Sequence, residues 1–206
     1  MKNKIWDCFC FRNELDLLEI RLNVLDQYVD KFVICEGVET FSGKDKELNY
    51  LNNKERFAKW KDKIIYINPP KVQTDDPFSR AGFQKDFIRT ELVNIAKDED
   101  IICYGDLDEI WKPQEINDDK IYNLKQLNYS YYLNSRSSEA WVGTVVGKWK
   151  TFKTDSVNYW RANHTNELEN GGWHFTNIGG IDQILKKLDS YDHCLEANTQ
   201  WVRDGL

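Results

Sequence analysis

The sequence predicts an α/β protein with a doubly wound, mixed and mainly parallel sheet, and two observations support this. Short, mainly apolar runs, typical of strands covered on both faces, occur at 5–11, 32–35, 64–67 and 101–104. Segments with apolar residues at helical spacing separate these runs, so that strand and helix alternate. With 206 residues, of which 41% are hydrophobic, the chain is long enough for one sizeable core, and one domain over 1–206 is expected.

The first helix is predicted directly after the run at 5–11. Asn13 and Asp16 resemble a capping box, which places a helix start at this point. The strand at 32–35 follows the helix, and Glu36 stands at its end. Between them, apolar residues recur at helical spacing while acidic residues fall elsewhere, as in an amphipathic helix packed on a sheet: Leu15, Leu18, Leu22, Leu25 and Val29.

A short helix is expected around 54–60, after a polar stretch. The strand at 64–67 comes next and is ended by Pro69-Pro70. Apolar residues between Phe83 and Ala96 mark a second long helix, and the strand at 101–104 follows it. These elements complete the alternation that predicts the doubly wound sheet.

The pattern changes in the last third of the chain. Between 127 and 133 apolar and polar residues alternate, which predicts a half-exposed, antiparallel strand that pairs with 141–149. The glycine-rich string GGWHFTNIGG at 171–180 is expected to form a loop before a final helix near 181–188.

Charge and cysteine content limit the class of protein. There are 28 basic and 34 acidic residues, so the formal net charge is -6 and the chain as a whole offers no basic footprint for nucleic acid. The five cysteines are an odd number, and three or four of them lie in apolar runs, which predicts free core thiols in a reducing compartment. Without a CxxC pair or a Cys/His cluster, no structural zinc site is expected.

The amino terminus, MKNKIWDCFCF, has neither a long apolar segment nor a small-residue cleavage site. We therefore expect no signal peptide and no membrane-spanning segment, and a cytoplasmic protein.

The string IICYGDLDEI at 101–110 carries the most chemical information. Ionised carboxylates are costly to bury, so Asp106 and Asp108 should lie where the apolar strand emerges. Residues two apart in an extended chain face the same way, and open α/β sheets bind ligands at the carboxyl ends of their strands. Together the two acids can hold Mg²⁺ or Mn²⁺ against phosphate oxygens. The alternative is a surface turn with solvated acids, but the buried strand before it and Gly105 favour a site.

Several strings, taken together, carry a resemblance to a known family: DCFCFRNELDLLEIRL, VDKFVICEG followed by TFSGK, NKERFAKWKDKII, DLDEI, and GGWHF followed by IGG. In this order they resemble glycosyltransferase family 17, whose best known members are the β-1,4-mannosyl-glycoprotein β-1,4-N-acetylglucosaminyltransferases. The resemblance extends from Asp7 to about Glu196.

The resemblance implies a GT-A-like domain in which 1–110 binds the nucleotide-sugar and 111–206 forms the acceptor side. It also implies a UDP-sugar donor, with N-acetylglucosamine or another hexose, a glycan or other hydroxyl acceptor, and inversion at the anomeric carbon. The metal would be Mn²⁺ or Mg²⁺. One departure is the string FQKDFIR at 83–89, where the family commonly shows Gln-Arg-Asn. Lys85 keeps a cation there but lacks the bidentate geometry of arginine.

Carried over residue by residue, the resemblance places Asn13 and Glu36 near the nucleoside, and Lys85 and Arg89 near the base or diphosphate. For Glu36 a solvated or helix-pairing acid is an equal alternative, and Arg89 alone would suit an ordinary solvated helix face. His174, between two glycine pairs, would be a third metal ligand beside the DLDEI acids or would contact the phosphate.

Two further features concern the sugar and the acceptor hydroxyl. Trp173 is singled out as a donor-binding aromatic, because sugars present C–H faces that lie well on rings. Inversion needs a base for the acceptor hydroxyl, and Glu139, in a polar loop, is ranked before Glu109 and Asp182.

Three alternatives stay open beside glycosyl transfer to a glycan. The first is transfer to a modified nucleic-acid base, against which the acidic balance speaks. The second is a sugar nucleotidyltransferase, which would normally need a glycine-rich phosphate loop near the first strand, where RNELD contains no glycine. The third is a sugar-binding module without turnover, which does not explain the intact DLDEI acids.

Overall fold

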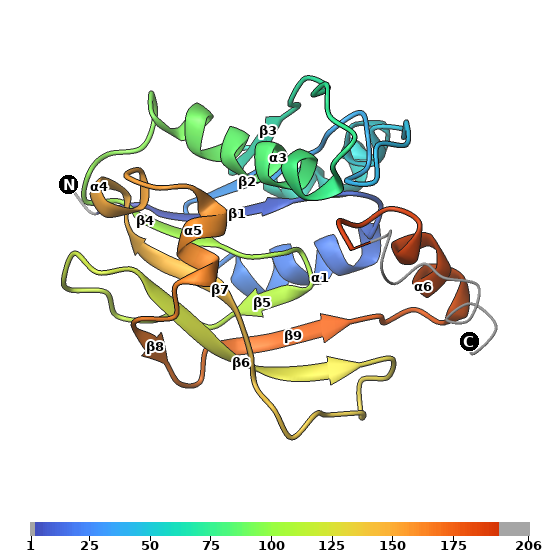
Figure 1. The fold of residues 1–206 in the computed structure, drawn as a ribbon. Helices are drawn as coiled ribbons and strands as arrows, with labels where there is room; N and C mark the ends of the chain where they lie inside the picture. Colours follow the sequence, from blue (N-terminus) through green and yellow to red (C-terminus); the bar gives the residue numbers. More distant parts are fainter. Residues whose placement is uncertain (1–2, 194–206) are drawn as a thin grey trace.

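The structure is a computed structural model that describes residues 3–193. Within this range the strands form one mixed sheet in the order β3-β2-β1-β4-β7-β6-β9-β5, with β8 paired to β6 outside that path. Helices cover the sheet on both faces (Figure 1). The predicted α/β class, with its doubly wound and mainly parallel mixed sheet, is confirmed.

The first part of the sheet is parallel and consists of β1 (Ile5–Cys10), β2 (Lys31–Cys35), β3 (Ile64–Ile67) and β4 (Ile101–Tyr104). Each is one of the apolar runs, as predicted, and β1 lies between β2 and β4. Because the four strands are parallel, their carboxyl ends meet at one edge of the sheet. The DLDEI string, which follows β4, therefore lies at the same edge of the sheet as Glu36, which follows β2.

The two faces of the parallel strands bury different helices. One face packs against α1 (Leu15–Leu25), through Leu18, Leu22 and Leu25. The other face packs against α3 (Pro77–Leu92), α4 (Trp149–Phe152) and α5 (Val157–Ala162). The short α2 (Asn49–Asn52) and the 3-10 helix η1 (Lys54–Trp60) extend the first core with Tyr50, Phe57 and Trp60.

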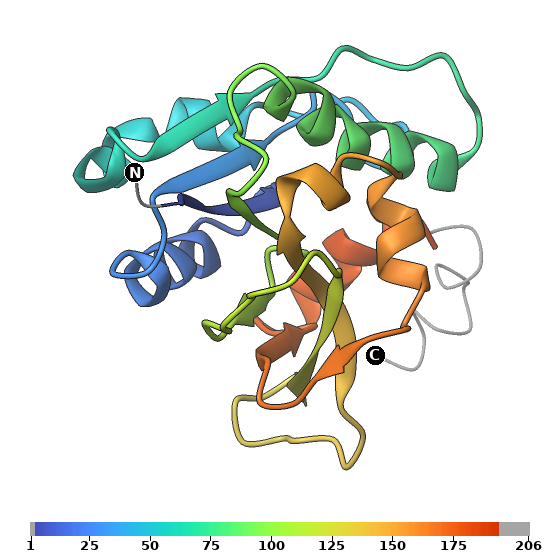
Figure 2. The ribbon, with the colours of Figure 1, turned by 90° about the vertical axis from the view of Figure 1, so that its left-hand side faces the viewer.

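The second part of the sheet is attached through β7 (Trp141–Lys148), which runs antiparallel to β4. β6 (Tyr122–Ser130) pairs antiparallel with β7 through residues 122–126. The strand predicted at 127–133 therefore begins earlier and ends at Ser130, and residues 127–130 pair parallel with 173–176 instead of with β7. β8 (Glu167–Leu168) pairs with β6. β9 (Gly172–Thr176) lies between β6 and β5 (Glu109–Trp111). Figure 2 shows this part curling away beneath the parallel strands.

The prediction of a loop at 171–180 is wrong for its first half, which forms strand β9. The paired glycines suggested irregular backbone, yet Trp173 and Phe175 alternate with His174 in the period of a strand. Its partner β5 is only three residues long and was not predicted. The final helix is confirmed as α6 (Ile181–Leu188), and in Figure 1 it lies beyond the ends toward which β1 and β9 point.

Two predicted helix starts are also corrected. The capping box at Asn13 does not form: Glu14 is the N-cap of α1, and no side chain caps the helix. The second long helix begins earlier than its apolar pattern indicated, because Asp76 caps it, accepting from Ser79 N at 2.8 Å, and Pro77 fills the first turn.

The cysteine predictions are tested at four positions. Cys8, Cys35 and Cys103 are buried in β1, β2 and β4, Cys10 is half-buried, and all four are free thiols. Cys194 lies outside the described residues. In the part of the chain that the structure describes, no helix is long and apolar enough to cross a membrane.

Candidate functional site

The DLDE turn after β4 is anchored from below by a buried ion pair. Arg21 of α1 and Asp7 of β1 are fully buried and form two hydrogen bonds, Nε to Oδ2 at 2.9 Å and Nη2 to Oδ1 at 2.7 Å. Arg21 Nη1 also donates to three main-chain carbonyls of residues 106–109, at 2.7 to 3.1 Å. Because each nitrogen of the guanidinium group donates to Asp7 or to the turn, α1 holds the turn in place.

Asp106 lies at the carboxyl edge of the parallel strands and is paired with Arg161 of α5. Arg161 Nη2 donates to Asp106 Oδ2 at 2.9 Å. Burial disfavours the ionised carboxyl, but Arg161, Lys85 and Lys187 outweigh it and lower the pKa of Asp106 to about 2. Asp106 is therefore an anion at any pH at which an enzyme would work.

Asp108 faces a lysine and a histidine from the far end of the chain. Lys187 Nζ of α6 donates to Asp108 Oδ2 at 3.2 Å, and His174 Nε2 lies 3.8 Å from Oδ1. Burial raises the pKa of the Asp108 carboxyl, although Lys187 and His174 act in the opposite direction. A further cation near Asp108 would strengthen its ionised form.

The imidazole of His174 is held on two sides. Its Nδ1 lies 3.0 Å from Asn128 Oδ1 on the neighbouring strand β6, and its ring stacks on Trp141 with a centroid distance of 4.4 Å. Because an amide oxygen only accepts, Nδ1 donates to it, and in the neutral imidazole the lone pair is then on Nε2, on the side of Asp108.

This geometry suits a divalent cation between Asp108 and His174. An imidazole lone pair and a carboxylate oxygen 3.8 Å apart are too far for a hydrogen bond, and each would be about 2.1 Å from a shared ion. The hydrogen bond to Asn128 fixes the orientation of the imidazole, as a bond from the other ring nitrogen usually does in histidines that bind a metal. Among residues 3–193, however, no group of three or more His, Cys, Asp or Glu side chains could hold a metal, so the predicted trio with Asp106 is not assembled. The other ligands of the ion would have to be phosphate oxygens of the bound nucleotide-sugar and water.

Glu109, the last residue of the turn, is not placed as a base. It is fully buried, and its carboxylate accepts from Trp141 Nε1 at 2.8 Å, from Thr144 Oγ1 at 2.9 Å and from Arg161 at 2.8 and 3.2 Å. Its two oxygens already accept four hydrogen bonds from the protein and face no solvent, so no open position is left for an acceptor hydroxyl. This finding removes Glu109 from the candidates for the base and gives it a positioning role.

The two residues predicted near the nucleoside occupy the ends of β1 and β2. Glu36 is fully buried and accepts from Lys46 Nζ at 3.0 Å and from the main-chain N of Tyr50 at 3.1 Å. These contacts favour the structural alternative for Glu36, which holds the polar stretch 37–53 against the sheet. Asn13, three residues after the end of β1, is half-buried, with Oδ1 accepting from Arg12 Nε at 3.1 Å.

The two residues of α3 that were predicted near the base or diphosphate lie in different surroundings. Lys85 is buried, its charge lowers the pKa of Asp106, and its Nζ lies 3.8 Å from a carboxylate oxygen of Asp192. Arg89 lies further along the helix, where it donates to the carbonyl of Lys153 at 3.1 Å. Lys85 thus lies close to Asp106, whereas the hydrogen bond of Arg89 ties α3 to the end of α4.

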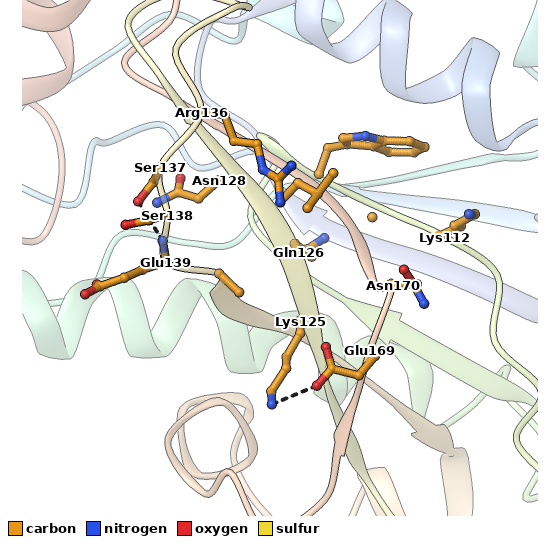
Figure 3. Close-up of a pocket in the computed structure, with 14 residues that line it drawn as sticks. Lys112, Lys125, Gln126, Asn128, Arg136, Ser137, Ser138, Glu139, Glu169 and Asn170 are labelled. Atoms are coloured by element: carbon orange, nitrogen blue, oxygen red, sulfur yellow. Dashed lines mark hydrogen bonds and ion pairs between the residues drawn. The ribbon is translucent and has the colours of Figure 1, made fainter.

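Trp173 and Glu139 lie together, apart from His174. Neighbouring residues on a strand face opposite sides, so Trp173 lies on the other face of β9 from His174, against the core beside α1. Both residues line a depression of about 240 Å³ between β6, β9 and the loop before β7. Figure 3 shows Glu139 pointing outward from this depression, away from Lys112 and Asn170. Their predicted roles stay predictions.

Sequence reasoning missed several residues that contact the cluster, namely Trp141, Arg161 and Lys187. Each is far from the DLDE turn along the chain, and none belongs to a motif that stands out by itself. Asp182, the remaining candidate for the base, is exposed in the first turn of α6.

Comparisons with known proteins were made for the whole chain. The family model described as Glycosyltransferase family 17 matches residues 1–203. No curated protein matches significantly. Among solved structures, the chain is similar to the galactosyltransferase LgtC in complex with donor and acceptor sugar analogs, with 11% identity, a TM-score of 0.39, and coverage of 81% of this chain and 67% of that chain. At this identity and TM-score, the similarity says nothing about substrate or mechanism.

Proposed function

The chain belongs to glycosyltransferase family 17 and is a glycosyltransferase, and from this premise we propose that it is inverting and metal-dependent. The proposed donor is a UDP-sugar carrying N-acetylglucosamine or another hexose, and the proposed acceptor is a hydroxyl group of a glycan. The proposal depends on one observation above all: Asp106 and Asp108 lie with three basic side chains at the carboxyl edge of the parallel strands.

Carboxylates and basic groups at one edge suit a bound nucleoside diphosphate. Open α/β sheets bind ligands at this edge, and Lys85 and Lys187 are placed to offset diphosphate charge. Asp108 and His174 are the proposed protein ligands of Mn²⁺ or Mg²⁺, with Asp106 beside them. When bound, the cation would stabilise the negative charge that develops on the diphosphate as the sugar leaves.

In the proposed reaction, the acceptor oxygen attacks the anomeric carbon from the side opposite the diphosphate. The bond from the anomeric carbon to the diphosphate oxygen breaks, the diphosphate keeps the electron pair, and a base takes the hydroxyl proton. Glu139 is the base predicted from the sequence. Turnover and donor affinity of Glu139→Gln test it, because loss of a base lowers turnover and leaves donor affinity unchanged.

A thermal-shift screen tests the donor and the metal together. UDP-, GDP-, CMP- and TDP-sugars are added with and without Mn²⁺, since a ligand that binds the folded state raises the melting temperature by mass action. We expect UDP-sugars to stabilise the protein only when Mn²⁺ is present, and Asp108→Ala to lose this effect. Equal shifts with and without Mn²⁺ would contradict the metal-dependent proposal, and a larger shift with another nucleotide would contradict the choice of UDP.

A further inference from the structure

Trp141 is an exposed ring that is nevertheless fixed. Its side chain is at the start of β7 and is 36% exposed, while Nε1 donates to Glu109 Oε1 at 2.8 Å and the ring stacks on His174 at an interplanar angle of 20°. The ring also crosses Gly143, where an added Cβ would lie 2.1 Å from Trp141 Nε1 and 2.3 Å from Glu109 Oε1. Any residue with a side chain at that position would displace the indole group.

The carboxylate that holds the ring is itself costly to bury. Glu109 is fully buried, and glycine is needed again at Gly105, where a Cβ would lie 2.7 Å from Glu109 Oε2. Its charge is offset by Arg161, which also binds Asp106. The buried carboxylate of Glu109 thus orients both the exposed ring of Trp141 and the guanidinium group of Arg161. A core built only for stability would not require this arrangement.

We propose that Trp141 is the platform on which the acceptor sugar stacks, and that Glu109 is the residue that positions it. The inference rests on the proposed function and adds the acceptor subsite to it. Sugar rings present C–H faces that pack on an aromatic ring, while the indole N–H is already used inside the protein. Trp141 stacks on His174, whose Nε2 is 3.8 Å from Asp108, so a sugar on the ring lies next to the donor end of the site.

Trp141 meets requirements that Trp173 does not. Trp173 lies on the opposite face of β9 from His174 and packs against the core. Sequence position singled out Trp173 as the aromatic residue that binds a sugar. For the acceptor sugar we assign this role to Trp141, which the fold places on the same side as His174 and Asp108.

The first arm of the test observes the ring directly, with no need of donor or turnover. Protein labelled with 5-fluorotryptophan is titrated with the methyl glycosides of mannose, galactose, glucose and N-acetylglucosamine, and fluorine spectra are recorded. The Trp141 signal is identified by its absence in Trp141→Phe. We expect at least one glycoside to shift this signal. If no glycoside shifts it at the solubility limit, the proposal is overturned, whatever the outcome with donors.

The second arm separates acceptor from donor. Binding and slow hydrolysis of the UDP-sugar that stabilises the protein most in the thermal-shift screen are measured first, with Mn²⁺ and without acceptor. If no UDP-sugar bound to the wild type, the proposed function would be contradicted, and the glycoside result would decide on Trp141 alone. With donor binding established, Trp141→Ala should raise the acceptor KM about tenfold, and the donor Kd should rise much less, by about twofold to threefold, because the ring also stacks on His174.

Two variants complete the design. Glu109→Gln keeps the shape but removes the charge that holds Arg161, and it should raise the acceptor KM less than Trp141→Ala does. Tyr28→Ala removes a comparably exposed ring, 42% exposed, after α1 and serves as the matched control without effect. A loss of donor affinity in Trp141→Ala equal to the change in acceptor KM would assign the ring to the donor or to His174 and overturn the inference.

Discussion

The buried pair of Arg21 and Asp7 gives a prediction whose magnitude follows from the structure. Arg21→Met removes two hydrogen bonds to Asp7 and three to the turn carbonyls. It leaves the fully buried carboxylate of Asp7 with a hydrogen bond from Trp111 Nε1 and without its cation. Removing one partner of a buried ion pair costs about 3–5 kcal/mol. Since a typical domain is stable by about 5–15 kcal/mol, we expect the variant to lose a large share of its stability.

Urea unfolding followed by tryptophan fluorescence measures this loss. The double variant Asp7→Asn, Arg21→Met should recover part of it, because no unpaired charge is then buried. Arg21→Lys should lose less, since it keeps the charge but cannot bond the same five acceptors. Arg56→Met, which removes an exposed arginine paired with Asp16 and Glu19, is the matched control and should change little. A loss below about 1 kcal/mol in Arg21→Met would refute the reasoning.

Three further predictions follow from the site and the core. Asp108→Asn should abolish transfer yet raise the melting temperature at pH 7. Burial raises the pKa of Asp108, so its ionised form destabilises the folded protein, and the gain in melting temperature should vanish below the unfolded pKa of about 3.9. A lower melting temperature of the variant at pH 7 would contradict this. His174→Ala should weaken Mn²⁺ dependence and donor binding together in calorimetry, whereas collapse of turnover at full donor affinity would indicate a base. Alkylation of Cys35 and Cys103 in native protein should be slow, because both are buried and burial raises the pKa of the Cys103 thiol; rapid modification would show that the strands open.

The sequence was sufficient for the parallel half of the fold. Strands β1 to β4 are short apolar runs covered on both faces, and such runs are visible without any knowledge of contacts. Strand β5 was not predicted, because Glu109–Trp111 is too short to show an alternation of apolar and polar residues and forms a strand only by pairing with β9. Strand β9 escaped because its glycines indicated a loop, and long-range pairing overrode that local preference.

The residues of the candidate site also differ in whether the sequence could predict them. Asp106 and Asp108 could be predicted from the sequence, because a motif at the end of a buried strand is local in sequence. Their partners could not, because Arg161 and Lys187 reach them from α5 and α6, and only the packing of these helices brings the charges together. Glu36 shows the opposite case: its position at a strand end suggested a ligand contact, and only the structure reveals the donors that already surround it.

The central claim is that Asp108 and His174, with Asp106 beside them, hold the donor through a divalent cation. Calorimetric titration of UDP-N-acetylglucosamine, with and without Mn²⁺, into the wild type and Asp108→Asn tests it most directly, with Asp62→Asn, an exposed acid before β3, as the control. We predict binding by the wild type and the control only with Mn²⁺, and at least about 100-fold weaker binding by Asp108→Asn. The same Kd for the wild type and Asp108→Asn in the presence of Mn²⁺ would contradict the account.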